Sequence, residues 1–194
     1  MQSEVMVLIG RTLAGDQTAF AALYHQYKNL VYKTSWLLLG NSAEADDALQ
    51  EVFLLAHRAL ATYQPERAAF STWLYRITTN YCLSWRRRRR LNLLPLEWAG
   101  HTADAAQRQH EERLEDTDTV FRCVQRLSGK KRAVVVLRYY WDLSYAEIAT
   151  ILDIPLGTVK SRLNEALRVM RDELGPLLSL EGATIPDVGG EVRP

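Results

Sequence analysis

The chain has 194 residues, of which 47% are hydrophobic and 24% charged, and its formal net charge is +1. This composition is typical of a globular protein and excludes wholesale disorder, and no apolar run approaches the ~18 residues that span a bilayer. The first residues combine an early acid with short apolar runs, unlike a signal peptide. The two cysteines, Cys82 and Cys123, fit neither a disulfide framework nor a metal-binding motif. We therefore expect a soluble, cytoplasmic protein.

Charge is segregated along the chain despite the small net value. Five arginines stand in a row at 86–90, and six acids occur with only two arginines between 104 and 118. Arginine accounts for 19 of the 24 basic residues, and its planar guanidinium suits bidentate contacts with phosphate and base edges. The local patches therefore need an explanation that the net charge does not provide.

Apolar residues recur with helical spacing through the first ninety residues. The pattern predicts a helix over 20–38, a second helix after Asn41, and a third over 70–81 that runs into the arginine block. Gly40 ends the first helix, Asn41 can cap the second, and the acids that follow suit the positive end of a helix. The segment around Pro65 is typical of a loop.

The domain organisation follows from where this pattern stops and resumes. Residues 91–114 contain proline, glycine and few large apolar side chains, which indicates a flexible linker. Helical spacing returns over 115–174, and the prolines and glycines of 175–194 indicate a disordered tail. The sequence thus predicts an all-α protein with two small domains, a helical bundle over 1–90 and a second unit over 115–174. Each is small enough to be only marginally stable alone.

A helix-turn-helix is expected in the second domain. The sequence SYAE is a capping box, in which Ser144 caps a short helix and Glu147 reaches back to the Ser144 amide. The segment 153–157 breaks that helix, and a longer one with a polar outer face begins near Thr158. This second helix would enter the major groove of DNA with its N-terminus first.

The polar face of that longer helix suits contacts with bases and phosphates. Lys160 and Arg168 can neutralise phosphate or read guanine, and Asn164 can read adenine. Glu165 could accept a hydrogen bond from a cytosine amino group or point at solvent. The alternative for the whole segment is a solvated amphipathic hairpin. The predicted DNA-binding residues of this domain are Lys160, Ser161, Arg162, Asn164, Glu165 and Arg168.

Three segments resemble a known family. SYAEIATILDIPLGTVKSRLNEAL is similar to the promoter-reading helix-turn-helix of extracytoplasmic-function (ECF) sigma factors, which belong to the sigma-70 family. EADDALQEVFLLAHRAL and FSTWLYRITTNYCLSWRRR resemble the N-terminal domain of these proteins, in the same order. The resemblance implies a protein that binds core RNA polymerase, directs it to specific promoters and helps open the DNA. It implies no catalytic residues, metal or cofactor of its own.

The resemblance also assigns polymerase docking to one helix of the N-terminal domain. The matching positions are Asp46, Asp47, Gln50, Glu51 and Phe53. Asp47, Gln50 and Glu51 share one helical face by their spacing, which forms a carboxylate strip suited to a basic partner. An acidic first turn is also favoured by the helix dipole alone.

For promoter opening, the resemblance implies that a loop and the helix after it capture the non-template DNA strand. The matching positions are Tyr63, whose ring could stack on a flipped base, and Asn80, whose amide could read a base edge. Arg76 lies nearby, and Trp73 is expected in the core. The arginine block would hold the DNA backbone through Arg86, Arg87, Arg88, Arg89 and Arg90. A partner that the family implies in addition is an anti-sigma factor, with no membrane insertion of the chain itself.

Two other functions are compatible with parts of the sequence. A stand-alone helix-turn-helix regulator that needs no polymerase would explain residues 115–174, but it leaves DDALQEVF and FSTWLYRITTN without a role. A metal-dependent hydrolase could use Asp46, Asp47, Glu51 and His57. The sequence has no second carboxylate cluster of matching spacing, Gly-rich phosphate loop or HExxH motif to complete such a site.

Overall fold

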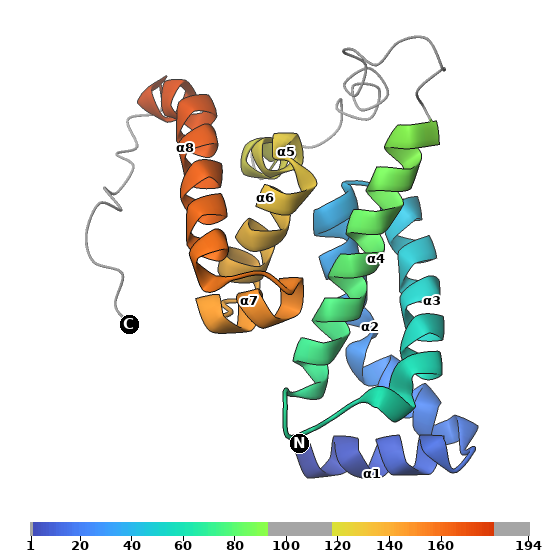
Figure 1. The fold of residues 1–194 in the computed structure, drawn as a ribbon. Helices are drawn as coiled ribbons and strands as arrows, with labels where there is room; N and C mark the ends of the chain where they lie inside the picture. The colour runs from blue at the N-terminus through green and yellow to red at the C-terminus, as the bar shows by residue number, and fades with distance from the viewer. Residues whose placement is uncertain (1, 93–117, 181–194) are drawn as a thin grey trace.

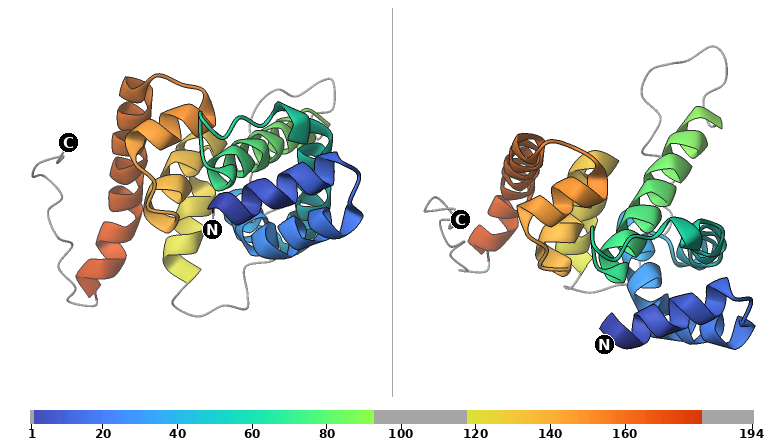
Figure 2. Two further views of the ribbon diagram at one scale, coloured as in Figure 1. Left: turned by 90° about the horizontal axis from the view of Figure 1, so that it is seen from below. Right: turned by 60° about the horizontal axis from the view of Figure 1, so that its bottom comes forward.

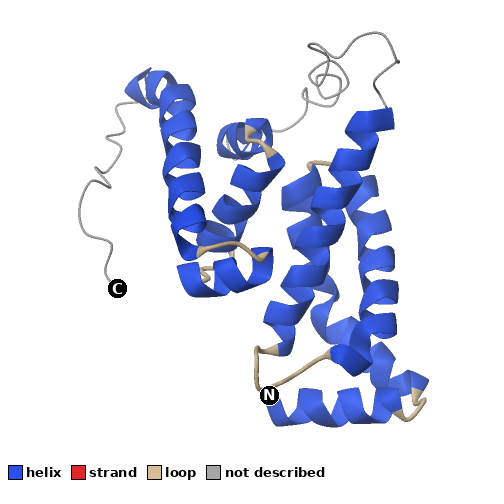
Figure 3. Cartoon of the chain, viewed as in Figure 1, coloured by secondary structure: helices blue, strands red, loops and turns tan. Residues whose placement is uncertain are grey.

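The computed structural model describes residues 2–92 and 118–180, which form helices joined by short turns (Figures 1 and 3). The first stretch contains α1 (Gln2–Leu13), α2 (Gln17–Leu39), α3 (Ser42–Ala59), the 3-10 helix η1 (Leu60–Thr62) and α4 (Phe70–Asn92). The second contains α5 (Asp118–Arg126), α6 (Gly129–Val135), the π-helix η3 (Val136–Tyr140), α7 (Tyr145–Leu152) and α8 (Leu156–Leu180). No strand occurs within these two stretches, and the predicted all-α class is confirmed.

One helix and two helix boundaries differ from the sequence predictions. Helix α1 was not predicted, and α8 begins at Leu156 rather than near Thr158. Helix α8 also continues to Leu180, so the start of the tail predicted from residue 175 is helical. The predicted linker, apart from the end of α4, and the tail beyond residue 180 lie outside the described residues.

The ends of α2 and α3 are determined by short-range hydrogen bonds. Asp16 caps α2, because its carboxylate accepts hydrogen bonds from the amides of Thr18 at 2.9 Å and Ala19 at 3.2 Å. Gly40 ends α2 in the left-handed region at φ 81°, where a side chain would be strained. Asn41 then accepts a hydrogen bond from the Glu44 amide at 3.0 Å and caps α3 as predicted.

Helices α1 to α4 form the N-terminal bundle (Figure 2). Helices α2, α3 and α4 pack side by side, and α1 crosses one end of them (Figure 1). The core of this bundle consists of apolar residues from every one of its helices, including Val5, Ile9, Leu23, Val31, Val52, Phe53, Leu60 and Leu74. The apolar face predicted for α3 is therefore buried here, which leaves its polar face outside.

The C-terminal unit contains the predicted helix-turn-helix. The capping box at α7 forms in both directions: the Glu147 amide donates to Ser144 Oγ at 3.2 Å, and the Ser144 amide donates to Glu147 Oε2 at 2.8 Å. Asp153 ends α7 with a left-handed φ of 53°. Helix α8 follows and packs its apolar face on α5, α6 and α7.

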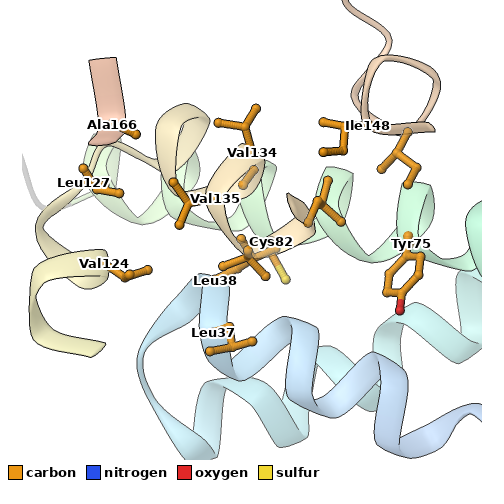
Figure 4. Packing of buried hydrophobic residues seen from close by; sticks show 14 of the residues in the cluster. Leu37, Leu38, Tyr75, Cys82, Val124, Leu127, Val134, Val135, Ile148 and Ala166 are labelled. Atoms are coloured by element: carbon orange, nitrogen blue, oxygen red, sulfur yellow. The ribbon is translucent and has the colours of Figure 1, made fainter. Parts of the chain in front are cut away.

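A second hydrophobic core joins the two domains, which the sequence did not predict (Figure 4). Leu37, Leu38, Tyr75 and Cys82 of the N-terminal bundle and Val124, Leu127, Val134, Val135 and Ile148 of the C-terminal unit all belong to this cluster. Two small helical units bury little apolar surface on their own, so packing against each other stabilises both. Among the helices of the described residues, none is long and apolar enough to cross a membrane.

Candidate polymerase and nucleic-acid interfaces

The outer face of α3 carries the predicted polymerase-docking residues. Asp46, Asp47, Gln50 and Glu51 are all exposed, and Leu54 beside them is 50% exposed. Helical spacing causes this arrangement, because the alanines and Val52 on the opposite face are buried in the bundle. The structure therefore presents a strip of polar and acidic side chains with the exposed apolar side chain of Leu54 beside it.

Phe53, the fifth predicted docking residue, does not belong to this strip. Its side chain is 5% exposed, and its ring lies 4.7 Å from Tyr24 and 6.2 Å from Phe20, measured between ring centroids. A ring in this position packs α3 on α2 and is covered from any partner. We therefore correct its assignment from docking to core packing.

A cavity of about 460 Å³ brings the three predicted strand-capture residues together. It lies between the loop after η1, helix α4 and helix α7, and its lining includes Tyr63, Arg76 and Asn80. Arg76 and Asn80 are exposed and one helical turn apart on α4. The opposite wall contains Thr150 and Ile151 of α7, which the sequence did not place near this site.

Tyr63 is part of the cavity wall but is not free to move as a stacking platform. Its side chain is 9% exposed, and its hydroxyl donates a hydrogen bond of 3.1 Å to the carbonyl of Ala68. Its ring packs on Phe70 and Trp73, with centroid distances of 5.4 Å and 5.5 Å. Burial raises the pKa of Tyr63 above its ordinary value. In this structure Tyr63 orders the loop, and the partly buried Trp73 supports it, as expected of a core residue.

The arginine block divides into residues with different environments. Arg86 is partly buried, and its guanidinium donates a hydrogen bond of 3.0 Å to the Leu38 carbonyl, so it is not free for phosphate. Burial lowers the pKa of Arg86. Arg89 pairs with Glu44 of α3 and lies over the Trp85 ring. Arg87 and Arg88 are exposed. The side chain of Arg90 lies outside the described residues.

The predicted recognition face of α8 is accessible. Its exposed members are Lys160, Ser161, Asn164, Glu165 and Arg168, whereas Arg162 is partly buried. Val159, Leu163 and Ala166 lie on the opposite, buried face. Sequence reasoning missed one contact here, since the Glu165 carboxylate pairs with Lys131 of α6 at 3.0 Å. No local pattern could have shown it, because these residues are on different helices.

Metal-ligating side chains do not cluster in residues 2–92 and 118–180. No three His, Cys, Asp or Glu side chains in these stretches lie close enough together to hold an ion. His57, a candidate in the hydrolase alternative, packs edge to face on Phe20 with a centroid distance of 4.7 Å.

Comparison with known proteins identifies the family of these two domains. Residues 23–91 match Sigma-70 region 2, and residues 118–170 match Sigma-70 region 4. The chain is 35% identical over 188 residues to the ECF RNA polymerase sigma factor SigW of Bacillus subtilis. This alignment covers 91% of this chain and all of SigW. The chain belongs to the ECF sigma factors. The family predicted from the sequence is therefore confirmed.

Other relatives align over most of the chain, and two solved structures have the same fold. This sigma factor is 33% identical over 183 residues to the ECF RNA polymerase sigma-E factor of Escherichia coli K12, across 89% of this chain and 95% of that protein. CnrH, solved in complex with the cytosolic domain of CnrY, aligns with a TM-score of 0.61 at 24% identity, over 92% of this chain and 99% of that one. RpoE of Bartonella quintana aligns with a TM-score of 0.62 at 20% identity, over 80% of this chain and 96% of that one.

The two matched regions divide the candidate surfaces between them. Region 2 contains the acidic face of α3, the loop and α4 side of the cavity, and the described part of the arginine block. Region 4 contains the helix-turn-helix and its exposed face on α8.

Proposed function

We propose that this sigma factor binds core RNA polymerase, directs it to a restricted set of promoters and helps to separate the DNA strands there. RNA synthesis itself is the chemistry of polymerase, and the sigma factor has no enzymatic activity of its own. It acts in the cytoplasm, where polymerase and chromosomal DNA are found. The sigma factor contributes three surfaces to this work.

The first surface docks on polymerase, and the exposed carboxylate strip of α3 is the observation that carries the proposal. Asp46, Asp47, Gln50 and Glu51 project from one rigid helix whose other face is anchored in the core. Carboxylates arranged in this way attract a basic partner and set its register. Leu54, half exposed beside them, adds apolar area at the centre of such a contact.

The second surface captures single-stranded DNA beside α4. Asn80 offers an amide to a base edge, and Arg76 offers a cation to the neighbouring phosphate. Arg87 and Arg88, exposed further along the same helix, extend the positive charge toward its C-terminal end. Tyr63 shapes the wall of the cavity, and stacking on its ring requires the loop to move.

The third surface reads duplex DNA upstream. Lys160, Ser161 and Asn164 lie in the first turns of α8, which is the end of a recognition helix that enters the major groove. Arg168 lies one turn further on and adds a phosphate contact. Ser161 donates its hydroxyl to the Thr158 carbonyl at 3.1 Å, so its oxygen remains available only as an acceptor.

An anti-sigma factor completes the proposed set of partners. Two proteins of the same fold support this: CnrH was solved with the cytosolic domain of CnrY, and RpoE of Bartonella quintana with the anti-sigma factor NepR. A protein that clamps both domains would keep this sigma factor from polymerase and DNA at the same time.

The docking proposal is tested by removing two carboxylates of the strip. We expect Asp47→Ala with Glu51→Ala to weaken binding to core polymerase about tenfold, since a loss of ~1.4 kcal/mol corresponds to that factor. Asp172→Ala, which removes an exposed acid from α8, is the matched control and should bind as the wild type does. Fluorescence anisotropy of the labelled sigma factor gives both affinities. Unchanged affinity of the double variant would refute the docking surface.

The same preparation separates this function from that of a stand-alone regulator. A sigma factor needs core polymerase to bind its promoter tightly, whereas a regulator binds duplex DNA by itself. Equal affinity for promoter fragments with and without core polymerase would therefore favour the regulator.

A further inference from the structure

We propose that Leu156 makes the helix-turn-helix selective for a thymine in the upstream DNA, through an apolar contact between its side chain and the C5-methyl group of that base. This inference rests on the proposed function of α8 in reading duplex DNA. To the polar groups of Lys160 and Asn164 it adds a contact of different chemistry, and it names the base that this contact selects.

Leu156 is a large apolar side chain without a place in the protein interior. It is the first residue of α8 and is 43% exposed. It belongs to neither hydrophobic core, whereas Ile154 and Val159, close to it in the chain, both pack into the core shared by the two domains. A single exposed leucine is ordinary on a protein surface, so its exposure has meaning only together with its position.

The position of Leu156 is the leading end of the proposed reading face. Residues spaced by four along a helix share one face, which places Leu156 in a row with the exposed side chains of Lys160 and Asn164. A recognition helix enters the major groove with its N-terminal residues against the base edges. Leu156 therefore reaches the floor of the groove together with the polar side chains of this row.

The residues on either side of Leu156 leave its side chain uncovered. Gly157 has no side chain, and a Cβ added there would meet no neighbouring atom within 4 Å. Pro155, which precedes the helix, is itself exposed. Both features allow this end of α8 to approach a base pair closely.

Hydrogen bonds within the helix-turn-helix hold the start of α8 in place. The Pro155 carbonyl accepts hydrogen bonds from the amides of Thr158 at 2.8 Å and Val159 at 3.2 Å, which closes the first turn of α8. The Ile154 amide donates to the Ala149 carbonyl of α7 at 3.1 Å, which ties this turn to the preceding helix. The leucine is thus presented on a rigid element, which positions a contact more precisely than a loop does.

Thymine is the base whose major-groove edge offers an apolar group, its C5-methyl group. The edges of guanine, adenine and cytosine present hydrogen-bond donors and acceptors there. A leucine that covers such an edge removes water from it and returns no hydrogen bond, which costs binding energy. Against thymine the same leucine buries a methyl group, which strengthens binding by about fourfold. The side chain therefore favours thymine over the other three bases.

The test removes the methyl group from the DNA and the leucine from the protein, separately and together. The full chain in complex with core polymerase first selects its preferred sequence from a pool of random duplexes. Each thymine of the selected duplex is then replaced in turn by deoxyuridine, which pairs as thymine does but lacks the methyl group. Fluorescence anisotropy gives the affinity of the complex for every duplex.

Two variants of Leu156 and one control are compared with the wild type. Leu156→Ala removes the apolar contact, and Leu156→Met keeps an apolar side chain of similar size. Val120→Ala is the matched control, because Val120 is an exposed apolar residue of the same domain but lies on α5. Helix α5 packs beside the later part of α8, where Arg126 pairs with Glu173, and away from the start of α8 (Figure 1). Circular dichroism checks that all variants keep their helices.

We expect one thymine at which deoxyuridine weakens binding of the wild type and of the control by about fourfold. Leu156→Ala should lose the same factor on the thymine duplex, and deoxyuridine at that position should then cause no further loss. Leu156→Met should still bind the thymine duplex more tightly than the deoxyuridine duplex, because its side chain can contact the methyl group.

The contrary results separate this contact from the proposed function. Deoxyuridine that changes no affinity overturns the thymine contact, and a loss that is equally large in Leu156→Ala does so too, because another residue then contacts the methyl group. In both cases the wild-type complex still selects a sequence, and the proposed function stands. A wild-type complex that selects no sequence at all would refute that function, and the thymine contact with it.

Discussion

Lys131 of α6 places its ammonium nitrogen 3.0 Å from Oε2 of Glu165, on the face of α8 that is proposed to read DNA. The side chain of Glu165 is 56% exposed and that of Lys131 is 29% exposed, so the pair lies at the edge of this face. The sequence left two roles open for Glu165, a hydrogen bond from cytosine or contact with solvent. The structure shows a third, in which a lysine of the same domain neutralises the carboxylate.

This pairing predicts that Glu165 does not select a base. In complex with core polymerase, Glu165→Gln should bind all promoter sequences somewhat more tightly, because it removes a negative charge near the phosphates and frees Lys131. The slope of log affinity against log salt should steepen by up to about one unit if Lys131 then contacts a phosphate. Anisotropy across single-base promoter variants measures both effects. A changed preference at a single base pair would show that Glu165 reads cytosine.

Lys160 and Arg168 are predicted to contribute to promoter binding and not to polymerase binding. Each substitution by alanine should weaken promoter binding by the polymerase complex and, for a lost phosphate contact, make the salt slope shallower by ~0.9. Affinity for core polymerase should stay at the wild-type value, since α8 belongs to the C-terminal unit and the α3 strip belongs to the N-terminal bundle. Lys33→Ala, which removes an exposed lysine of α2, is the control. Equal loss in both assays would contradict this division of roles.

The capping box of α7 is predicted to stabilise the recognition domain. Ser144→Ala removes the acceptor of the Glu147 amide and should lower the free energy of unfolding by about 1 kcal/mol, the usual cost of losing an N-cap. Ser42→Ala is the control, because α3 is capped by Asn41 and not by Ser42. Urea denaturation followed by circular dichroism gives both values. A stability equal to that of the wild type would mean that the box contributes nothing.

Cys82 is predicted to make the folded chain sensitive to alkaline pH. Burial raises the pKa of its thiol to about 12, whereas the thiol of an unfolded chain has a pKa of ~8.5. Below the unfolded value the thiol is neutral in both states and has no effect. As the pH rises from there toward the folded value, only the unfolded chain ionises, so stability falls.

The measurement for Cys82 compares pH slopes between variants. Cys82→Ala should lose less stability between pH 8 and pH 10.5 than the wild type does, as judged from urea midpoints, whatever its stability at pH 7. Burial also raises the pKa of Tyr75, so the variant still loses some stability at alkaline pH. Identical slopes for both chains would show that Cys82 ionises in the folded state as it does in the unfolded one.

Structural features that depend on residues close together in the sequence were predictable. The end of α2 at Gly40, the cap at Asn41 and the capping box of Ser144 and Glu147 all occur where the sequence placed them. The exposed acidic strip of α3 and the polar face of α8 also follow from helical spacing. In each case the groups that interact lie within a few residues or turns of one helix.

Predictions failed where a side chain found a partner far away in the sequence. Phe53 was expected to dock on polymerase, but its ring is buried against Phe20 and Tyr24 of another helix. Arg86 looked like its neighbours in the arginine block, yet its angle on α4 turns it toward the Leu38 carbonyl. Nothing in the run of arginines distinguishes it from Arg87 or Arg88.

The sequence by itself determined the helices that follow α1, the caps at Asn41 and Ser144, the polar faces of α3 and α8, and the family to which the chain belongs, because these depend on short spacings and recognisable segments. Only the tertiary structure decided which polar side chains are free and how the two domains meet. The hydrogen bond from Arg132 to the Leu38 carbonyl joins residues 94 positions apart. Such a contact depends on how whole helices pack, and the packing of two units leaves no periodic trace in either one.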